Sequence, residues 1–197
     1  MENNPIPTQF YSPSGQILSE RIFQGNQVLL TQYYLSSALY SIQRFASNVK
    51  EGKQEYFYEA GTPKTIEIYE AGTLHGETLL YWPNGQIKRK CAFKRGVRHG
   101  WDQMWSSEGH LIDEGCYENA QAIGIHKRFG KEGCLIEEIT YLEGTRFNIR
   151  QWDELGSLRL DAEWIDLKTY REKVWDRFQK IWIEKEGYWD GKKLIYT

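Results

Sequence analysis

The sequence lacks the features of several common protein classes. No apolar run approaches the roughly 20 residues that a membrane-spanning helix needs. The opening segment, MENNPIPTQF, has neither the basic stretch nor the apolar core of a signal peptide, so we expect a cytoplasmic protein. The 3 cysteines form no CxxC pair, which favours buried thiols in a reducing compartment over a disulfide framework.

The sequence also lacks a strong excess of charge of either sign. Its net charge is -2, which gives no general reason to expect nucleic acid or a membrane as a partner. Hydrophobic residues make up 40% of the chain and charged residues 26%, a balance typical of a folded soluble protein and not of a disordered one. The 197 residues are enough for one ordinary domain.

What the sequence does contain is a repeated phrase. An aromatic residue opens each repeat and recurs every 23 or 24 residues, at Tyr11, Tyr34, Phe57, Tyr81, Trp105, Phe129 and Trp152. A glycine follows four residues later in most repeats, at Gly15, Gly61, Gly85, Gly109, Gly133 and Gly156. Ala38 takes this place in the second repeat, where the turn needs another geometry or some strain.

The repeated phrase predicts a β-hairpin. Segments such as WPNG and YEAG are turn formers that end on glycine, which accepts the positive φ of a tight turn. The flanking runs, for example GETLLYW and QIKRKCAF, have the length and the composition of strands. We therefore predict a mostly β fold, an elongated single-layer antiparallel sheet of about seven stacked hairpin repeats.

One stretch, YWPNGQIKRKCAFKRGVRHGWDQMW at residues 81–105, carries a family resemblance. Its aromatic-x-x-x-Gly-x-aliphatic pattern, followed by an aromatic residue and two further glycines, resembles the MORN repeat. It resembles more closely the degenerate MORN variant of the bacterial YwqK-type antitoxin family. The resemblance implies an elongated, twisted sheet of hairpins that acts as a scaffold or interaction module. It supplies no catalytic residue, and it therefore implies no enzyme.

The C-terminal part departs from the repeat. The apolar residues of DLKTYREKVWDRFQKIWIEKEG follow a helical spacing, at Tyr170, Val174, Phe178, Ile181 and Trp182. This spacing predicts an amphipathic helix that ends near Gly187, followed by a terminal strand or hairpin. We expect this part to cap the last repeats, and the alternative is that its apolar stripe binds a partner. The predicted organisation is a tail at 1–10, a repeat domain at 11–167 and a cap at 168–197.

No constellation in the sequence predicts a catalytic residue, a cofactor site or a metal site. There is no Walker loop, no GxGxxG and no nucleophile elbow. His75 and His99 occupy equivalent places in adjacent repeats, but such residues lie roughly 10 Å apart, whereas zinc ligands approach the metal to about 2 Å. Cys91, Cys116 and Cys134 fall at different repeat positions, so we predict no shared site.

One local run breaks the charge balance. Between Lys88 and Gly100 the sequence has basic residues and no acidic one. The neighbouring repeats carry acids at matching places, for example Glu70 and Glu118 beside Lys94, which predicts a ladder of alternating charges between hairpins. The alternative is a basic patch that binds an acidic protein, phosphate groups or lipid headgroups.

The sequence thus predicts a non-catalytic protein–protein interaction scaffold, with an antitoxin-like role as its narrower form. We expect the partner to be another protein and not nucleic acid. The candidate surface combines the basic run with two tryptophans: Lys88, Arg89, Lys90, Lys94, Arg95, Arg98, Trp101 and Trp105. The alternative function, which we do not favour, is peripheral binding to an anionic membrane through the basic patch of residues 88–98.

Overall fold

The computed structural model describes residues 6–142, 145–166, 168–190 and 193–197. It divides into two compact units, which are Met1–Gly100 with Met104–Gly109, and Trp101–Gln103 with His110–Thr197. Within the described residues both units consist of β-strands and turns, apart from one short 3-10 helix, η1 (Lys131–Gly133), in the second unit. Strand β11 (Val97–Trp105) contributes residues to both units.

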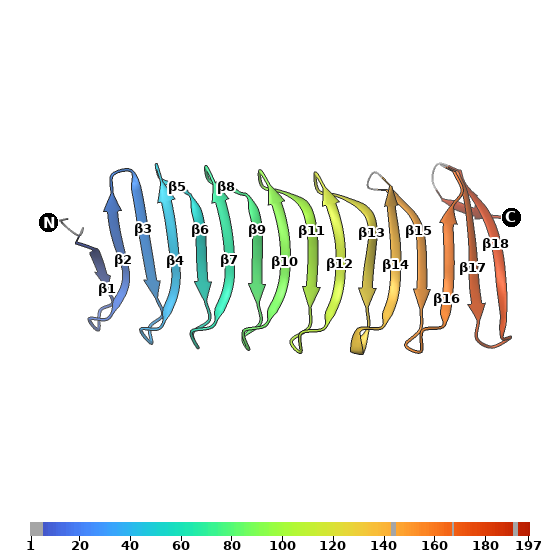
Figure 1. The fold of residues 1–197 in the computed structure, drawn as a ribbon, viewed down its shortest axis with the longest axis horizontal. Helices are drawn as coiled ribbons and strands as arrows, with labels where there is room; N and C mark the ends of the chain where they lie inside the picture. The colour runs from blue at the N-terminus through green and yellow to red at the C-terminus, as the bar shows by residue number, and fades with distance from the viewer. Residues whose placement is uncertain (1–5, 143–144, 167, 191–192) are drawn as a thin grey trace. The chain divides into compact units, whose positions relative to one another are not determined.

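The first unit is a single layer of antiparallel strands (Figure 1). Its strands are β1 (Thr8–Tyr11), β2 (Ile17–Gln24), β3 (Gln27–Tyr33), β4 (Leu39–Ala46), β5 (Val49–Lys50), β6 (Gly52–Phe57), β7 (Pro63–Glu70), β8 (Thr73–Leu74), β9 (Gly76–Tyr81) and β10 (Ile87–Lys94). Each long strand pairs with the next long strand in the sequence. The prediction of antiparallel hairpins is therefore confirmed in this unit.

The second unit repeats this arrangement (Figure 1). Its further strands are β12 (Leu111–Glu118), β13 (Gln121–Phe129), β14 (Leu135–Leu142), β15 (Thr145–Trp152), β16 (Leu158–Trp164), β17 (Thr169–Asp176), β18 (Ile181–Trp189) and β19 (Leu194–Tyr196). From β12 to β19 each strand runs antiparallel to the one before it. The hairpin prediction is confirmed here as well.

Tight turns join the strands of each hairpin, and their geometry explains the recurring glycine. Gly85 has a φ of 87°, and its N–H donates to the carbonyl of Trp82 over 2.9 Å. The same bond spacing and a positive φ occur at Gly15, Gly61, Gly109, Gly133 and Gly156. Because a Cβ is strained at such a φ, the turns favour glycine at this place.

The second hairpin differs from the sequence alignment by one residue. Ser37, one residue before the expected place, donates its N–H to the carbonyl of Tyr34 and has a φ of 67°. The opening aromatic residue is therefore Tyr33, which pairs with Leu39. Counting from Tyr33 puts Leu39 at the aliphatic position of the repeat and Phe45 at its second aromatic position. Because Tyr33 and Tyr34 are both aromatic, the sequence pattern allows either of them as the first residue of the second repeat.

The predicted C-terminal helix is wrong, because the segment forms the β17–β18 hairpin. Phe178, which we expected on a buried stripe, is 84% exposed at the turn between these strands. Asp176 organises the turn, since its Oδ1 accepts hydrogen bonds from the N–H groups of Phe178 and Gln179. The terminal strand that the sequence predicted is present as β19, which pairs with the end of β18.

Cross-strand pairing explains why the helical spacing misled. Tyr170 and Val174 are four residues apart, and such residues share a face in a strand as well as in a helix. Arg171 between them is directly opposite Glu163 on one side and Glu186 on the other. The β-branched and aromatic residues of IWIEKEGYW further favour a strand.

Neither unit has an apolar core of the usual size. Among the described residues, the buried apolar side chains are Cys91 in the first unit and Ile149 and Ala162 in the second. The buried polar or charged residues are Ser41, Gln54, Thr78, Asp102 and Glu172. A single layer of strands cannot enclose many side chains, so strand pairing and contacts between neighbouring hairpins carry much of the stability.

Candidate interaction surface

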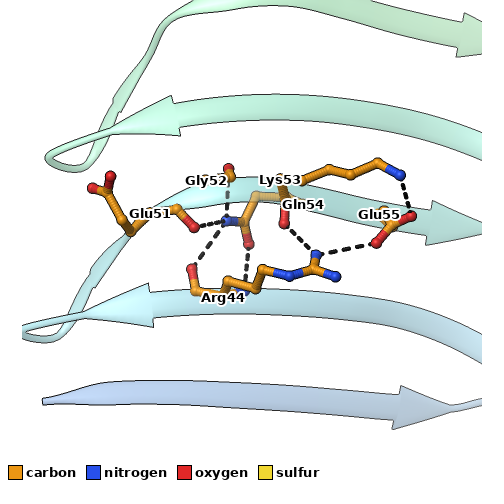
Figure 2. A network of polar contacts seen from close by, with 6 residues as sticks. All are labelled: Arg44, Glu51, Gly52, Lys53, Gln54 and Glu55. Carbon is orange, nitrogen blue, oxygen red and sulfur yellow. Dashed lines mark hydrogen bonds and ion pairs between the residues drawn. The ribbon is translucent and has the colours of Figure 1, made fainter. Parts of the chain in front are cut away.

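A buried glutamine joins two neighbouring hairpins of the first unit (Figure 2). Strand β4 pairs with β5 at one end and with β6 at the other, and Arg44 faces the break between β5 and β6. The Oε1 of Gln54 accepts from the N–H of Arg44 at 3.0 Å, and its Nε2 donates to the carbonyl of Arg44 at 3.0 Å. Nε2 also lies 3.1 Å from the carbonyl of Glu51 and 3.2 Å from that of Gly52. The carboxamide thus replaces a peptide group where the strand is interrupted.

Charged side chains flank this bridge. Arg44 Nη1 donates to Glu55 Oε2 at 3.0 Å, and Lys53 Nζ lies 2.6 Å from Glu55 Oε1 (Figure 2). Burial by itself raises the pKa of Glu55, but the hydrogen bonds from Lys53 and Arg44 outweigh burial and hold the pKa below its ordinary value. The carboxylate is therefore charged at neutral pH and ties β6 to β4.

A row of alternating charges crosses the second unit. From β12 to β18 the directly opposed residues of this row are Glu114, Lys127, Glu138, Arg150, Asp161, Lys173 and Glu184. We call this row the charge ladder. Arg150 lies 3.9 Å from Glu138 and 3.2 Å from Asp161, and Lys173 lies 2.8 Å from Glu184. Exposed pairs contribute little singly, but opposite charges across strands favour one register.

Alternating charges of the kind that the sequence suggested beside Lys94 thus occur in the second unit. A shorter row accompanies it, in which Arg128 lies 3.7 Å from Asp113 and 3.2 Å from Glu137. Burial raises the pKa of Asp113, and the charge of Arg128 opposes that rise without cancelling it. Gln151 ends the row by donating to Glu137 at 2.7 Å. Both rows pair charges within the unit.

The basic run of β10 is divided between the two faces of its strand. Lys90 and Lys94 point to one face of the strand and Arg89 to the other, while a register shift between Ile87 and Arg89 interrupts the alternation at Lys88. Lys88 Nζ lies 4.4 Å from the centre of the Trp82 ring, and Lys90 Nζ lies 2.9 Å from Glu77 Oε1. The sequence prediction therefore brings together residues that do not form one continuous patch.

The remaining residues of the predicted surface lie in different settings. Arg95 is exposed in a turn with a φ of 51°, and Arg98 is half-buried in β11. Trp105 is half-buried, and its carbonyl accepts from Nε1 of Trp82 at 3.0 Å in the first unit. Trp101 belongs to the second unit and is 53% exposed. Of the two tryptophans, Trp101 is thus the one that can bury a large area against a partner.

The second unit exposes a further apolar residue at the repeat position of Trp101. Ile125, 24 residues further on, is 49% exposed. Equivalent positions of successive repeats lie on the same face of the sheet, so these two side chains present apolar area on one face. Sequence reasoning missed Ile125, although its place in the repeat was a signal that could have found it.

Sequence reasoning also missed an open groove on the second unit, with a volume of about 690 Å³. It is lined by Leu142, Thr145, Arg146, Phe147, Trp164, Asp166 and Trp189. Phe147 is 41% exposed and Trp189 is 42% exposed, so the groove presents aromatic area to solvent. Its residues come from four strands and a turn, and no single repeat position predicts it.

The side chain of His126 is held in place by its neighbours in the second unit. The ring of His126 lies between Tyr117 and Tyr141, with ring centres 5.1 Å and 4.7 Å away. Its Nε2 donates to the carbonyl of Cys116 at 2.9 Å. Among the described residues, no group of three or more His, Cys, Asp and Glu side chains is arranged to hold a metal ion.

Comparison with known proteins supports the hairpin repeats. Residues 50–71 and 74–95 match the MORN repeat variant. These two stretches lie in the first unit, in β5–β7 and in β8–β10. A search of curated proteins finds no match to the chain. The resemblance to MORN-variant repeats is therefore confirmed for these stretches, and the narrower resemblance to YwqK-type antitoxins stays a prediction.

None of the helices in the described part of the chain is long and apolar enough to cross a membrane.

Proposed function

We propose that this chain is a non-catalytic protein-interaction scaffold that presents the faces of its hairpin sheets to a partner protein. The observation that carries the proposal is the contrast between buried and exposed apolar residues. The described residues bury Cys91, Ile149 and Ala162, while Trp101 is 53% and Ile125 is 49% exposed. A sheet without a covering layer leaves such side chains available, and tryptophan is enriched at the centres of protein interfaces.

The MORN-variant match supports an interaction role of this kind. The resemblance to YwqK-type antitoxin repeats extends the proposal to a cytoplasmic partner that the sheet neutralises by covering it. The proposal that the chain is not an enzyme rests on the repeated phrase, which carries no catalytic signature. Binding to anionic membranes is the weaker reading, because Lys88 and Lys90 are engaged with Trp82 and Glu77.

A comparative capture experiment tests the proposal. Wild-type chain, the double variant Trp101→Ala/Ile125→Ala and the control variant Phe178→Ala are each used as bait in lysate of the native cell. Phe178 is 84% exposed but lies in a turn, so its removal changes apolar area without touching the sheet face. We expect one protein to be enriched by wild type and by the control, and recovery to fall at least about tenfold with the double variant.

The result that would contradict the proposal is equal recovery by all three baits. Vesicles with anionic headgroups serve as the comparison for the membrane reading. Binding to these vesicles that is lost in roughly 0.5 M salt, without any captured protein, would favour that reading instead. The unfolding temperature of each bait is measured first, so that a loss of recovery is not confused with a loss of folding.

A further inference from the structure

The outer edge of β18 is open along its first half. β19 pairs with the last three residues of β18, and Thr197 donates its N–H to the carbonyl of Glu186 at 2.9 Å. In the parts of the chain that the structure describes, no strand pairs with the outer side of residues 181–185. This segment is therefore an edge with a free row of backbone groups.

The direction of those backbone groups follows from the bond at Glu186. The carbonyl of Glu186 points outward, and in an antiparallel strand every second residue directs its N–H and C=O to the same side. Trp182 and Glu184 therefore direct their N–H and C=O groups outward. An added strand would find donors and acceptors at the ordinary spacing of a sheet.

The charge ladder ends at this same edge. Inside the ladder a residue such as Arg150 has an acid on both sides, Glu138 and Asp161. Glu184 is the last member and has Lys173 on one side only, at 2.8 Å. On the opposite face of β18, Lys185 Nζ lies 3.7 Å from Glu172 and 5.4 Å from the centre of the Tyr196 ring in β19, and no described residue pairs with Lys185 on its outer side. A strand added at this edge would continue the alternation of charges if it carried a basic residue opposite Glu184 and an acidic residue opposite Lys185.

We propose that the edge at residues 181–185 binds an extended segment of a partner protein, which adds to the sheet as an antiparallel strand. The segment carries an acidic residue opposite Lys185, a basic residue opposite Glu184, a β-branched residue opposite Ile183 and an aromatic residue opposite Trp182. The inner neighbour β17 shows the same pattern, because its residues EKVWD at 172–176 pair with residues 185 to 181 in this order.

A second copy of this chain fits the edge poorly. A twofold antiparallel pair places one residue opposite itself on the axis. With Lys185 on the axis, two lysines oppose each other and Glu184 faces Glu186. With Glu184 on the axis, two glutamates oppose each other. With Ile183 on the axis, Glu184 faces Trp182 and neither charge gains a partner. With Trp182 on the axis, Glu184 faces Lys180, but Lys180 lies in the turn before β18 with a φ of 57°, and Lys185 faces Gln179 and gains no acid. Charge complementarity therefore favours a foreign strand over self-pairing.

Peptide binding to the full chain tests the proposal. The probe is a fluorescein-labelled peptide GSEKVWDGS, and the control is GSKEVWDGS, which has the same composition and net charge. We expect the probe to bind about tenfold more tightly than the control, because two opposed pairs change from unlike to like charges. Fluorescence anisotropy at low salt measures both affinities, and added salt should narrow the difference.

Two variants of Glu184 separate the backbone from the side chain. Glu184→Pro removes an outward N–H that β17 does not use, so the β17–β18 hairpin should persist and peptide binding should be lost. Glu184→Gln keeps the N–H, so binding should persist with less preference for the probe. Far-ultraviolet circular dichroism and thermal melting show whether each variant folds. If Glu184→Pro does not fold, the peptide preference of Glu184→Gln alone decides the test.

Several results would overturn the proposal. They are absence of probe binding, equal binding of both peptides, and probe binding that is unchanged in a folded Glu184→Pro variant or keeps its full preference in Glu184→Gln. A wild-type dimer that Glu184→Pro converts to monomer would show that a second copy fills the edge. The edge is separate from Trp101 and Ile125, so failure here would leave the proposed scaffold function untouched, and the reverse also holds.

Discussion

Replacing Gln54 by leucine should destabilise the first unit strongly, although the new side chain is apolar and of similar size. Gln54 is 0% exposed, and its carboxamide supplies the hydrogen-bond partner for the N–H of Arg44. Leucine leaves this N–H buried without a partner, and it also removes the donor to the carbonyls of Glu51 and Gly52. The carbonyl of Arg44 keeps one donor, the N–H of Glu51 at 2.9 Å.

The expected loss follows from these contacts. One orphaned donor costs about 1–3 kcal/mol, and weakened solvation of two carbonyls adds to it, while the apolar side chain returns about 1 kcal/mol. We therefore expect a net loss of about 3 kcal/mol, or a fall in Tm of roughly 6–12 °C. Urea unfolding followed by tryptophan fluorescence and circular dichroism measures the free energy of unfolding.

The chain supplies a matched control at the same position of the next repeat. Thr78 is 6% exposed, and its hydroxyl has no hydrogen-bond partner among the described residues. Thr78→Val removes this hydroxyl and keeps the shape, so stability should be unchanged or rise by up to about 1 kcal/mol. The reasoning is refuted if Gln54→Leu stays within about 1 kcal/mol of wild type, or if Thr78→Val is equally damaging.

Three further predictions concern a turn, a close contact and a buried phenol. Gly85→Val should lower the free energy of unfolding, measured in urea, by about 1–3 kcal/mol, because Gly85 has a φ of 87° that valine adopts only with strain. Beyond the two chain neighbours, no described atom lies within 4 Å of the added Cβ, so backbone strain accounts for the whole effect, and wild-type stability would contradict the prediction. Gly115→Ala should destabilise severely, because a Cβ at this position would overlap Nδ1 of His126. Adding His126→Ala should restore part of the lost stability, and a double variant no more stable than Gly115→Ala would show that the clash lies elsewhere. Burial, followed by the charge and hydrogen bond of Glu172, raises the pKa of Tyr170 from 10.0 to about 12. Because the folded state holds the Tyr170 proton more tightly than the unfolded state, the stability that comes from this difference is fully present below pH 10.0 and is lost as the pH rises toward about 12. Over that interval the free energy of unfolding of Tyr170→Phe should therefore fall by about 1 kcal/mol less than that of wild type, after allowance for partial exposure. Parallel pH profiles of the two proteins would contradict this prediction.

The hairpins could be predicted from the sequence because each carries its own signals. A turn such as WPNG needs a positive φ at its glycine, and the strands beside it have strand composition. These are local requirements, and they recur at one spacing along the chain. The second turn shows the limit of this reasoning, because Tyr33 and Tyr34 satisfy the same pattern and only the pairing of Tyr33 with Leu39 separates them.

Features that depend on neighbouring strands could not be predicted in the same way. The spacing of Tyr170 and Val174 suits a helix and a strand, and the partners of Arg171 on β16 and β18 decide for the strand. The role of Gln54 depends on a break between β5 and β6 that no residue pattern announces. The charge ladder needs the hairpins to be aligned in register before its alternation is visible.

The measurement that tests the scaffold account most directly is covalent side-chain labelling of the chain, alone and with its captured partner. Hydroxyl radicals label exposed side chains, and mass spectrometry reports the extent at each residue. The account predicts that the partner protects Trp101 and Ile125, which are 53% and 49% exposed in the free chain, while Phe178 in its turn stays labelled. Unchanged labelling of Trp101 and Ile125 in a saturated complex would contradict it.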